Sequence, residues 1–178
     1  MQQLVGVKLP AAGRALLKGL LQGFIGLRQA EDFEAYCQRH QPVVFVGPYE
    51  HHSNEISWRE SLVTVVEVAM ADDGGIDLQH LEALLQDPAY RGRMRIGSFS
   101  AASNVTGMRS PVERLAQLLH RYDALAFFDF AASAPYVPID MNPSAADGEE
   151  HAFLDAVFIS PHKFLGGPGA SGLLIFNQ

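Results

Sequence analysis

An acidic and an amine side chain, Asp129 and Lys163, each follow a strongly apolar run of the sequence. Alone, such an aspartate is usually a turn or helix cap, and such a lysine is usually a solvated charge. Together they favour a binding site, because a carboxylate and an amine drawn partly out of water each need a partner. An aromatic ring with a protonated nitrogen and an aldehyde satisfies both, since the ring N–H pairs with the acid and the aldehyde condenses with the amine.

Two further polar stretches follow apolar runs in the same way. The stretch EHHSN, residues 50–54, comes after the run at 43–46, and SNVTG, residues 103–107, comes after the run at 94–100. In open α/β sheets, ligands bind outside the carboxyl ends of the strands. If the four runs are neighbouring parallel strands, their polar ends meet at one edge, which is the predicted site.

The elements that position these residues follow from apolar periodicity and from turn residues. Helices are predicted at 10–27, 31–41, around Trp58, at 77–88 and at 110–122. Strands are predicted at 43–46, 64–70, 94–100, 124–128, 156–160 and 173–176, and a proline-rich loop at 132–147. The helix at 110–122 carries an expected capping box, with Ser110 as N-cap, Pro111 in the first turn and Glu113 as the reciprocal partner.

Strands that alternate with helices favour parallel pairing, because parallel neighbours need a long right-handed crossover. The predicted fold class is therefore α/β, a three-layer αβα architecture with a mostly parallel sheet. The length of 178 residues and the 48% hydrophobic content suit a packed globular core.

Charge and cysteine content limit the classes of function. The net charge of −7 comes without a basic cluster, so a nucleic-acid partner is not expected. One cysteine excludes an internal disulfide, and the first residues lack the pattern of a secretory signal, which favours a cytoplasmic location. No apolar run approaches the roughly 20 residues of a membrane-spanning helix.

The sequence around Lys163 resembles a known family. The segment DAVFISPHKFLGGPGASG, residues 155–172, is similar to the strand, Ser-x-His-Lys sequence and Gly-Pro-rich turn around the cofactor lysine in the cysteine desulfurase branch of class V aminotransferases. These are fold type I enzymes that use pyridoxal 5′-phosphate (PLP). EHHSN, SNVTG and the pair Phe128–Asp129 look like the other three cofactor segments of the family, in the same order, and the resemblance spans residues 43–176.

The resemblance implies three contacts to the PLP ring. His51 would stack on the pyridine ring and act in catalysis, and Asn104 would lie near the ring hydroxyl. Asp129 would hold the ring nitrogen protonated, which keeps the electron sink that PLP provides.

The resemblance also implies contacts at the other end of the cofactor. Ser160 and His162 would contact the phosphate, and Lys163 would be the Schiff-base residue and proton shuttle.

No metal site is expected, because one cysteine and scattered histidines poorly support a zinc centre. The glycines at 166–172 also match neither a nucleotide P-loop nor a nucleophile elbow.

Three features depart from the family pattern. Ala132 stands where the family usually has a glutamine, three residues after the pyridine-pairing aspartate. The phosphate-binding turn that the family carries further upstream is not found before Pro10. The sequence ends at Gln178, without a small C-terminal domain. Cys37, the single cysteine, lies too far upstream to match the nucleophile of desulfurases.

The expected domain organisation is therefore a helical segment at 1–42 and a PLP-binding large-domain core at 43–178, with the small C-terminal domain absent. The leading functional hypothesis is a fragment of a PLP enzyme that acts on a small amino acid, nearest to cysteine desulfurase, selenocysteine lyase or class V aminotransferase. The alternative is a non-catalytic PLP-fold module that serves as an interaction surface. For the full-length protein, the resemblance implies a homodimer.

Overall fold

A six-stranded sheet forms the centre of the protein in the computed structural model, which describes residues 7–8, 11–143 and 151–177. The strand order is β2-β1-β3-β4-β5-β6, and only the pair β5–β6 is antiparallel. The predicted mostly parallel α/β fold is thus confirmed. The strands are β1 (Val43–Val46), β2 (Thr64–Glu67), β3 (Arg95–Ser100), β4 (Leu125–Asp129), β5 (Ala156–Ile159) and β6 (Leu173–Phe176).

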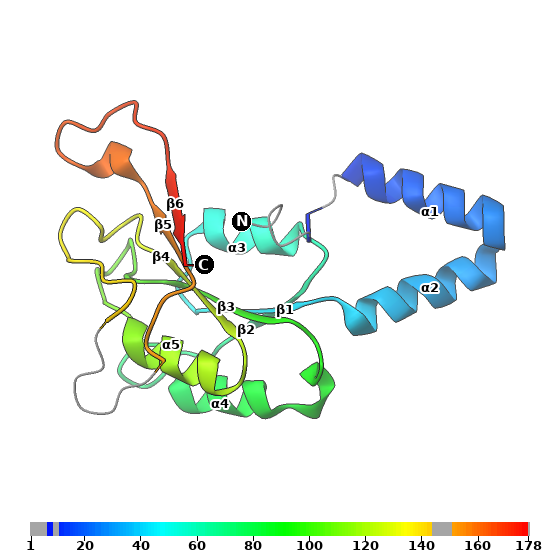
Figure 1. Cartoon of the computed structure of the whole chain (residues 1–178), viewed down its shortest axis with the longest axis horizontal. Coiled ribbons are helices and arrows are strands. Elements are labelled where there is room, and N and C mark those ends of the chain that lie inside the picture. The colour runs from blue at the N-terminus through cyan, green and yellow to red at the C-terminus, as the bar shows by residue number, and fades with distance from the viewer. Residues whose placement is uncertain (1–6, 9–10, 144–150, 178) are drawn as a thin grey trace.

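Helices cover both faces of the sheet (Figure 1), as the predicted three-layer architecture requires. On one face, Trp58 of α3 (His52–Arg59) packs with Val44 and Val46 of β1. On the other face, α4 (Leu78–Gln86) and α5 (Val112–Arg121) pack over Val43 and Phe45 of the same strand. Because β1 is apolar on both sides, it is buried on both sides, which is typical of a central parallel strand.

Close contact between α5 and the sheet depends on Gly97 of β3. A Cβ atom at this position would overlap the side chain of Leu119 in α5 and the ring of Phe99. Both neighbours are fully buried, so neither can move aside easily. Gly97 therefore allows the helix to approach the strand to a distance that a larger residue would prevent.

Two N-terminal helices, α1 (Ala11–Ile25) and α2 (Leu27–His40), form a hairpin that extends away from the sheet beyond the amino end of β1 (Figure 1). Gly26 lies between them with a φ of 84°, a conformation that favours glycine. The helices predicted at 10–27 and 31–41 agree with these bounds to within a few residues, although Pro10 lies outside the described residues.

Asp77 caps α4 as predicted, but two other local predictions are wrong. The strand predicted at 64–70 ends at Glu67, and Met70 forms only an isolated bridge with Ile76 across the turn that follows. The capping box at 110–113 is also absent, because α5 begins at Val112 without a side-chain cap.

Tertiary contacts explain why the capping box does not form. The Ser110 hydroxyl donates instead to the carbonyl of Ser100 at 2.6 Å, where it satisfies a buried group at the end of β3.

Of the predicted proline-rich loop, residues 144–147 lie outside the described residues. Within the described part of the chain, no helix is long and apolar enough to cross a membrane.

Candidate active site

A cavity of about 340 Å³ opens at the carboxyl ends of the parallel strands. All six of the site residues predicted from the sequence border this cavity, although they come from four separate parts of the chain. The lining residues are His51, Ser53, Ser100, Ala102, Asn104, Asp129, Ala131, Ala132, Ser160, His162 and Lys163. The ends of neighbouring strands thus bring residues that are distant in the sequence to one cavity.

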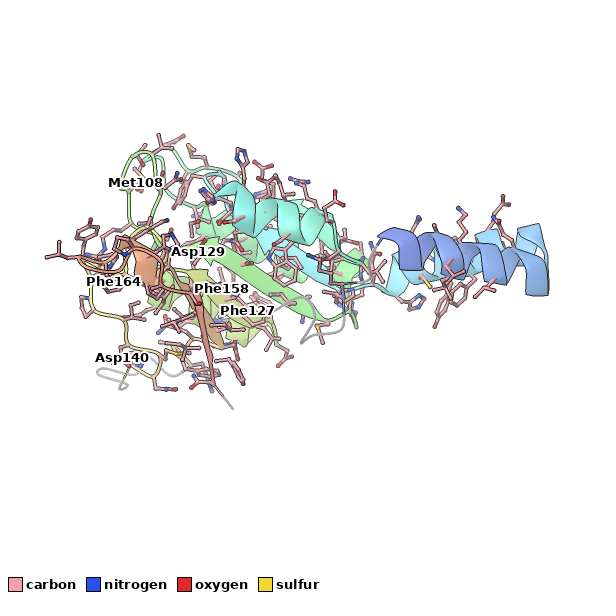
Figure 2. All side chains as sticks on the ribbon, turned by 90° about the horizontal axis from the view of Figure 1, so that it is seen from above. Met108, Phe127, Asp129, Asp140, Phe158 and Phe164 are labelled. Carbon is pink, nitrogen blue, oxygen red and sulfur yellow. The ribbon has the colours of Figure 1, made fainter. Side chains whose placement is uncertain are left out.

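Asp129 is the last residue of β4 and is half-buried at the floor of the site. Figure 2 shows Asp129 at the end of the sheet opposite the α1–α2 hairpin. Its Oδ1 atom accepts a hydrogen bond from the backbone N–H of Ala131 at 2.8 Å. Among the described residues no hydrogen bond reaches Oδ2, so this oxygen is available to accept a proton donor in the cavity.

His51 lies at the N-terminus of α3, where its backbone is extended and its side chain caps the helix. Its Nδ1 atom accepts from the backbone N–H of Ser53 at 3.2 Å and lies 2.7 Å from the Ser53 hydroxyl. Because Nδ1 accepts a hydrogen bond, a neutral His51 ring carries its proton on Nε2. The cap therefore fixes both the place and the tautomer of the ring.

Asn104 lies in an exposed turn that follows β3. The Ser103 hydroxyl holds this turn by accepting from the backbone N–H groups of Val105 and Thr106, both at 3.2 Å. Gly107 completes it with a φ of 73°, which a residue with a side chain rarely adopts. Asn104 is thereby held at the cavity by backbone geometry.

Ser160, His162 and Lys163 follow β5, and the last two belong to a short 3-10 turn, η2 (Pro161–Lys163). The backbone N–H of Lys163 donates to the carbonyl of Ser160 at 3.0 Å. Gly167 closes the loop against this turn, since a Cβ atom there would overlap the carbonyl oxygen of Pro161. The turn directs the chain so that Ser160 and Lys163 both border the cavity.

Asp129 and Lys163 are both expected to be drawn partly out of water, and the structure agrees for Asp129 only. Asp129 is half-buried, whereas Lys163 is exposed. The difference follows from the backbone, because Asp129 still belongs to a central strand while Lys163 lies in a loop beyond the sheet. Within the described residues Lys163 makes neither a side-chain hydrogen bond nor an ion pair.

A second cavity of about 290 Å³ adjoins the first and shares Ser53, Asp129, Ala131 and Ser160 with it. Its remaining wall comes from α3 and from the end of β5, namely Asn54, Ser57, Trp58, Phe158 and Ile159. Asp129 therefore lies between two hollows at the same edge of the sheet.

Sequence reasoning missed Ser100 and underrated Glu50. Ser100 is the last residue of β3 and lines the cavity, and Glu50 accepts a hydrogen bond from its hydroxyl at 2.7 Å. The signal for Ser100 in the sequence is a polar residue directly at the end of an apolar strand, the same signal that marks Asp129. Glu50 lies in the polar stretch that follows the strand ending at Val46. Ala132, where the family pattern has glutamine, also borders the cavity and offers it only a methyl group.

With this geometry established, comparisons with known proteins identify the family. The family model described as aminotransferase class-V matches residues 32–178. The chain belongs to the class V aminotransferase family. The predicted family is thus confirmed, over a region that contains every residue bordering the cavity.

Relatives in this family include proteins named as probable cysteine desulfurases. One from Chlamydia muridarum is 38% identical over 135 residues, which is 74% of this chain and 30% of the relative. Another, from Halalkalibacterium halodurans, is 30% identical over 135 residues, again 74% of this chain and 30% of the relative. The chain thus spans less than a third of the length of these class V relatives.

Solved structures agree with the fold. A cysteine desulfurase from Escherichia coli matches with a TM-score of 0.62 and 26% identity, over 80% of this chain and 34% of that one. A cysteine desulfurase from Thermococcus onnurineus matches with a TM-score of 0.63 and 23% identity, over 79% of this chain and 32% of that one. At that lower identity the match concerns the fold alone.

Proposed function

We propose that this chain forms the cofactor-binding core of a PLP-dependent enzyme that acts on a small amino acid. The observation that carries the proposal is the shared cavity, in which an aspartate with a free carboxylate oxygen and an unpaired lysine border the same space. Membership of the class V aminotransferase family supports the same assignment.

The residues present fit PLP in the chemistry of their donors and acceptors. PLP needs an acceptor for its ring N–H, a primary amine for its aldehyde and hydrogen-bond donors for its phosphate. Oδ2 of Asp129 is open to accept, Lys163 supplies the amine, and Ser160 with His162 supplies donors on the same rim. Lys163 would hold the cofactor through its amine, which would condense with the aldehyde and release water.

The side chains around the cavity have separate proposed tasks. Asp129 would hold a proton on the ring nitrogen by charge and hydrogen bonding, and His51, with its tautomer fixed by Ser53, would stack on the ring. Asn104 would bind the ring hydroxyl. When bound, PLP supplies an electron sink that stabilises negative charge at the substrate Cα. Lys163 would accept and return the Cα proton, because its amine borders the same cavity as Asp129.

Cysteine is the first substrate to test, because the relatives described above are named cysteine desulfurases. Aminotransferase and selenocysteine lyase activities are the other proposed reactions. With the chain, PLP and a thiol reductant such as dithiothreitol present, desulfurase action converts L-cysteine to alanine and transfers a sulfur atom that the thiol reduces to sulfide. Transamination instead consumes an oxo acid and releases no sulfide. Assaying both products separates these reactions.

The binding proposal is tested by mixing the whole chain with PLP and recording the visible absorbance band of the lysine linkage. Borohydride reduction followed by peptide mass spectrometry then locates the cofactor. The chain has three lysines, Lys8, Lys18 and Lys163. We expect the label on Lys163, loss of the band in Lys163→Ala, and no loss in Lys8→Ala, which removes another exposed lysine. Absence of a band in the unchanged chain would favour the non-catalytic module instead.

We further propose that residues 1–42 form a separate helical segment and residues 43–178 the cofactor core. The projection of α1 and α2 away from the sheet supports this division (Figure 1). A homodimeric full-length protein, a cytoplasmic location and the lack of a nucleic-acid partner stay predictions. Light scattering of the full-length protein tests the first of these.

A further inference from the structure

Glu50 is a half-buried acid whose two carboxylate oxygens are both occupied by donors. Oε1 accepts from the backbone N–H groups of Gly47 at 3.1 Å and Ser100 at 2.9 Å. Oε2 accepts from Nδ2 of Asn54 at 2.8 Å and from the Ser100 hydroxyl at 2.7 Å. All four partners donate, so the arrangement is suited to an ionised carboxylate.

These hydrogen bonds join the chain segments that form the cavity. Gly47 follows β1, Asn54 belongs to the first turn of α3 beside His51, and Ser100 ends β3. Ser100 lies directly opposite Asp129 in the pairing of β3 with β4. Glu50 therefore connects the helix end that carries His51 to the strand end beside Asp129.

A second set of contacts makes this connection rigid. Asn54, which is buried, also donates to the carbonyl of Ser98 at 3.2 Å and accepts from the Ser98 hydroxyl at 2.8 Å. The indole N–H of Trp58 donates to the same hydroxyl at 2.9 Å. Asn54 and Trp58 thus both attach α3 to Ser98 of β3. The groups that donate to Glu50 are therefore held in fixed positions by the packing of the helix on the sheet.

The negative charge of Glu50 has no cationic partner among the described residues. The pKa of the Glu50 carboxyl is raised, because burial outweighs the hydrogen bonds from Asn54, Ser100 and Gly47, which lower it. A charge withdrawn from water without a counter-ion favours positive charge nearby. Asp129, opposite Ser100, adds a second acid at this end of the sheet.

We infer that Glu50 is a positioning residue for the proposed cofactor site, and that its charge stabilises the protonated, cationic form of the lysine linkage in the cavity. The first part follows from the hydrogen bonds that hold Ser100 and Asn54, because Asn54 lies in the first turn of the helix that His51 caps. The second follows from an uncompensated acid one residue from the cavity wall. This inference rests on the proposed PLP function.

Other titratable groups also act on the charge of the linkage. Those around Glu50 and the cavity are Tyr49, His51, Asp129, His162 and Lys163. Burial is the largest cause of the raised pKa of the neighbouring Tyr49 hydroxyl, and the charges of Glu50 and Asp73 raise it further. A substitution at Glu50 removes none of these other titratable groups, and comparing Glu50→Gln with Glu50→Asp separates the effect of the charge from the effect of position.

The test compares the pH titration of the visible PLP band in the unchanged chain, in Glu50→Gln and in Glu50→Asp. Glu50→Gln keeps the size of the side chain but removes its charge, and we expect the pKa of the band to fall by about 0.5 to 1.5. Glu50→Asp keeps the charge but is too short for all four donors. We expect it to leave the pKa of the band nearly unchanged and to weaken PLP binding about 3- to 30-fold.

Glu55→Gln is the matched control, because Glu55 is an acid of the nearby helix α3 that pairs with Arg59 at the surface. It should alter neither the pKa of the band nor the affinity for PLP. Circular dichroism establishes that each variant is folded, and Glu50→Asp still tests the positioning role if Glu50→Gln does not fold. Equal pKa values of the band in all variants overturn the electrostatic role, and unchanged PLP affinity in Glu50→Asp overturns the positioning role. Absence of any band in the unchanged chain instead overturns the proposed function, and this inference with it.

Discussion

Asp129 and Lys163 border the same cavity from two different kinds of backbone. Asp129 ends a central parallel strand, whereas Lys163 ends a 3-10 turn in an exposed loop. The acid is therefore fixed by the sheet, while the amine depends on a few local contacts. This difference predicts that substitutions at the two sides of the cavity will affect cofactor binding for different reasons.

On the strand side, we expect Asp129→Asn to weaken PLP binding about 10- to 100-fold, because a charged hydrogen bond to the ring nitrogen is lost. Asparagine still has an oxygen that can accept from the Ala131 N–H, so the turn is retained. Asp140→Asn is the control, since Asp140 makes the same type of bond to the N–H of Asn142 in another loop (Figure 2). Absorbance titration with PLP measures both, and equal affinities would contradict the proposed role.

On the loop side, Gly167→Ala should disturb the turn that carries Lys163. The added Cβ would overlap the backbone carbonyl of Pro161, which cannot rotate away as a side chain could. We expect slower and weaker formation of the PLP band with little change in the urea midpoint, because the loop contributes little to the core. Gly172→Ala in the same loop meets only an ordinary contact and serves as the control. If both variants form the band equally well, the close approach is not needed for the site.

The ends of β4 and β6 could be predicted from the sequence because each coincides with a change from apolar to polar residues. The end of β4 at Asp129 is one residue beyond the expected end, and β6 has the expected bounds. The cap of α5 could not be predicted, because the Ser110 hydroxyl bonds to Ser100, on a strand that precedes it in the chain. The exposure of Lys163 likewise depends on how far a loop stands from the sheet, which local sequence does not determine.

Core packing gives a prediction that is independent of the cofactor. Gly97→Ala should lower the free energy of unfolding by about 1–3 kcal/mol, because the new methyl group overlaps Leu119 and Phe99 in a filled core. Gly19→Ala is the control, since Gly19 lies in helix α1 with open space around it. That change should be neutral or slightly stabilising. Urea denaturation measures both, and equal midpoints would show that α5 can move away from β3.

The last prediction concerns His120, near the end of α5. Its Nδ1 atom lies 2.7 Å from the carbonyl oxygen of His151, and its Nε2 atom lies 2.8 Å from Oδ2 of Asp155. Both neighbours are acceptors, so only the doubly protonated ring can donate to both. Burial lowers the pKa of the imidazole, but the hydrogen bonds to Asp155 and His151 outweigh it, and the net pKa is raised above 6.5.

Because the pKa of His120 is higher in the folded than in the unfolded chain, its stabilising effect is complete below about pH 6.5 and is lost as the pH rises through the folded value. The free energy of unfolding should therefore fall with rising pH in this window, by at most about 1.4 kcal/mol per pH unit from this group. His120→Gln should remove that part of the slope, and His52→Gln, at an exposed position, should not. Urea denaturation at several pH values measures the difference. A slope that His120→Gln leaves unchanged would mean that the native ring is neutral, with one of its two acceptors unsatisfied.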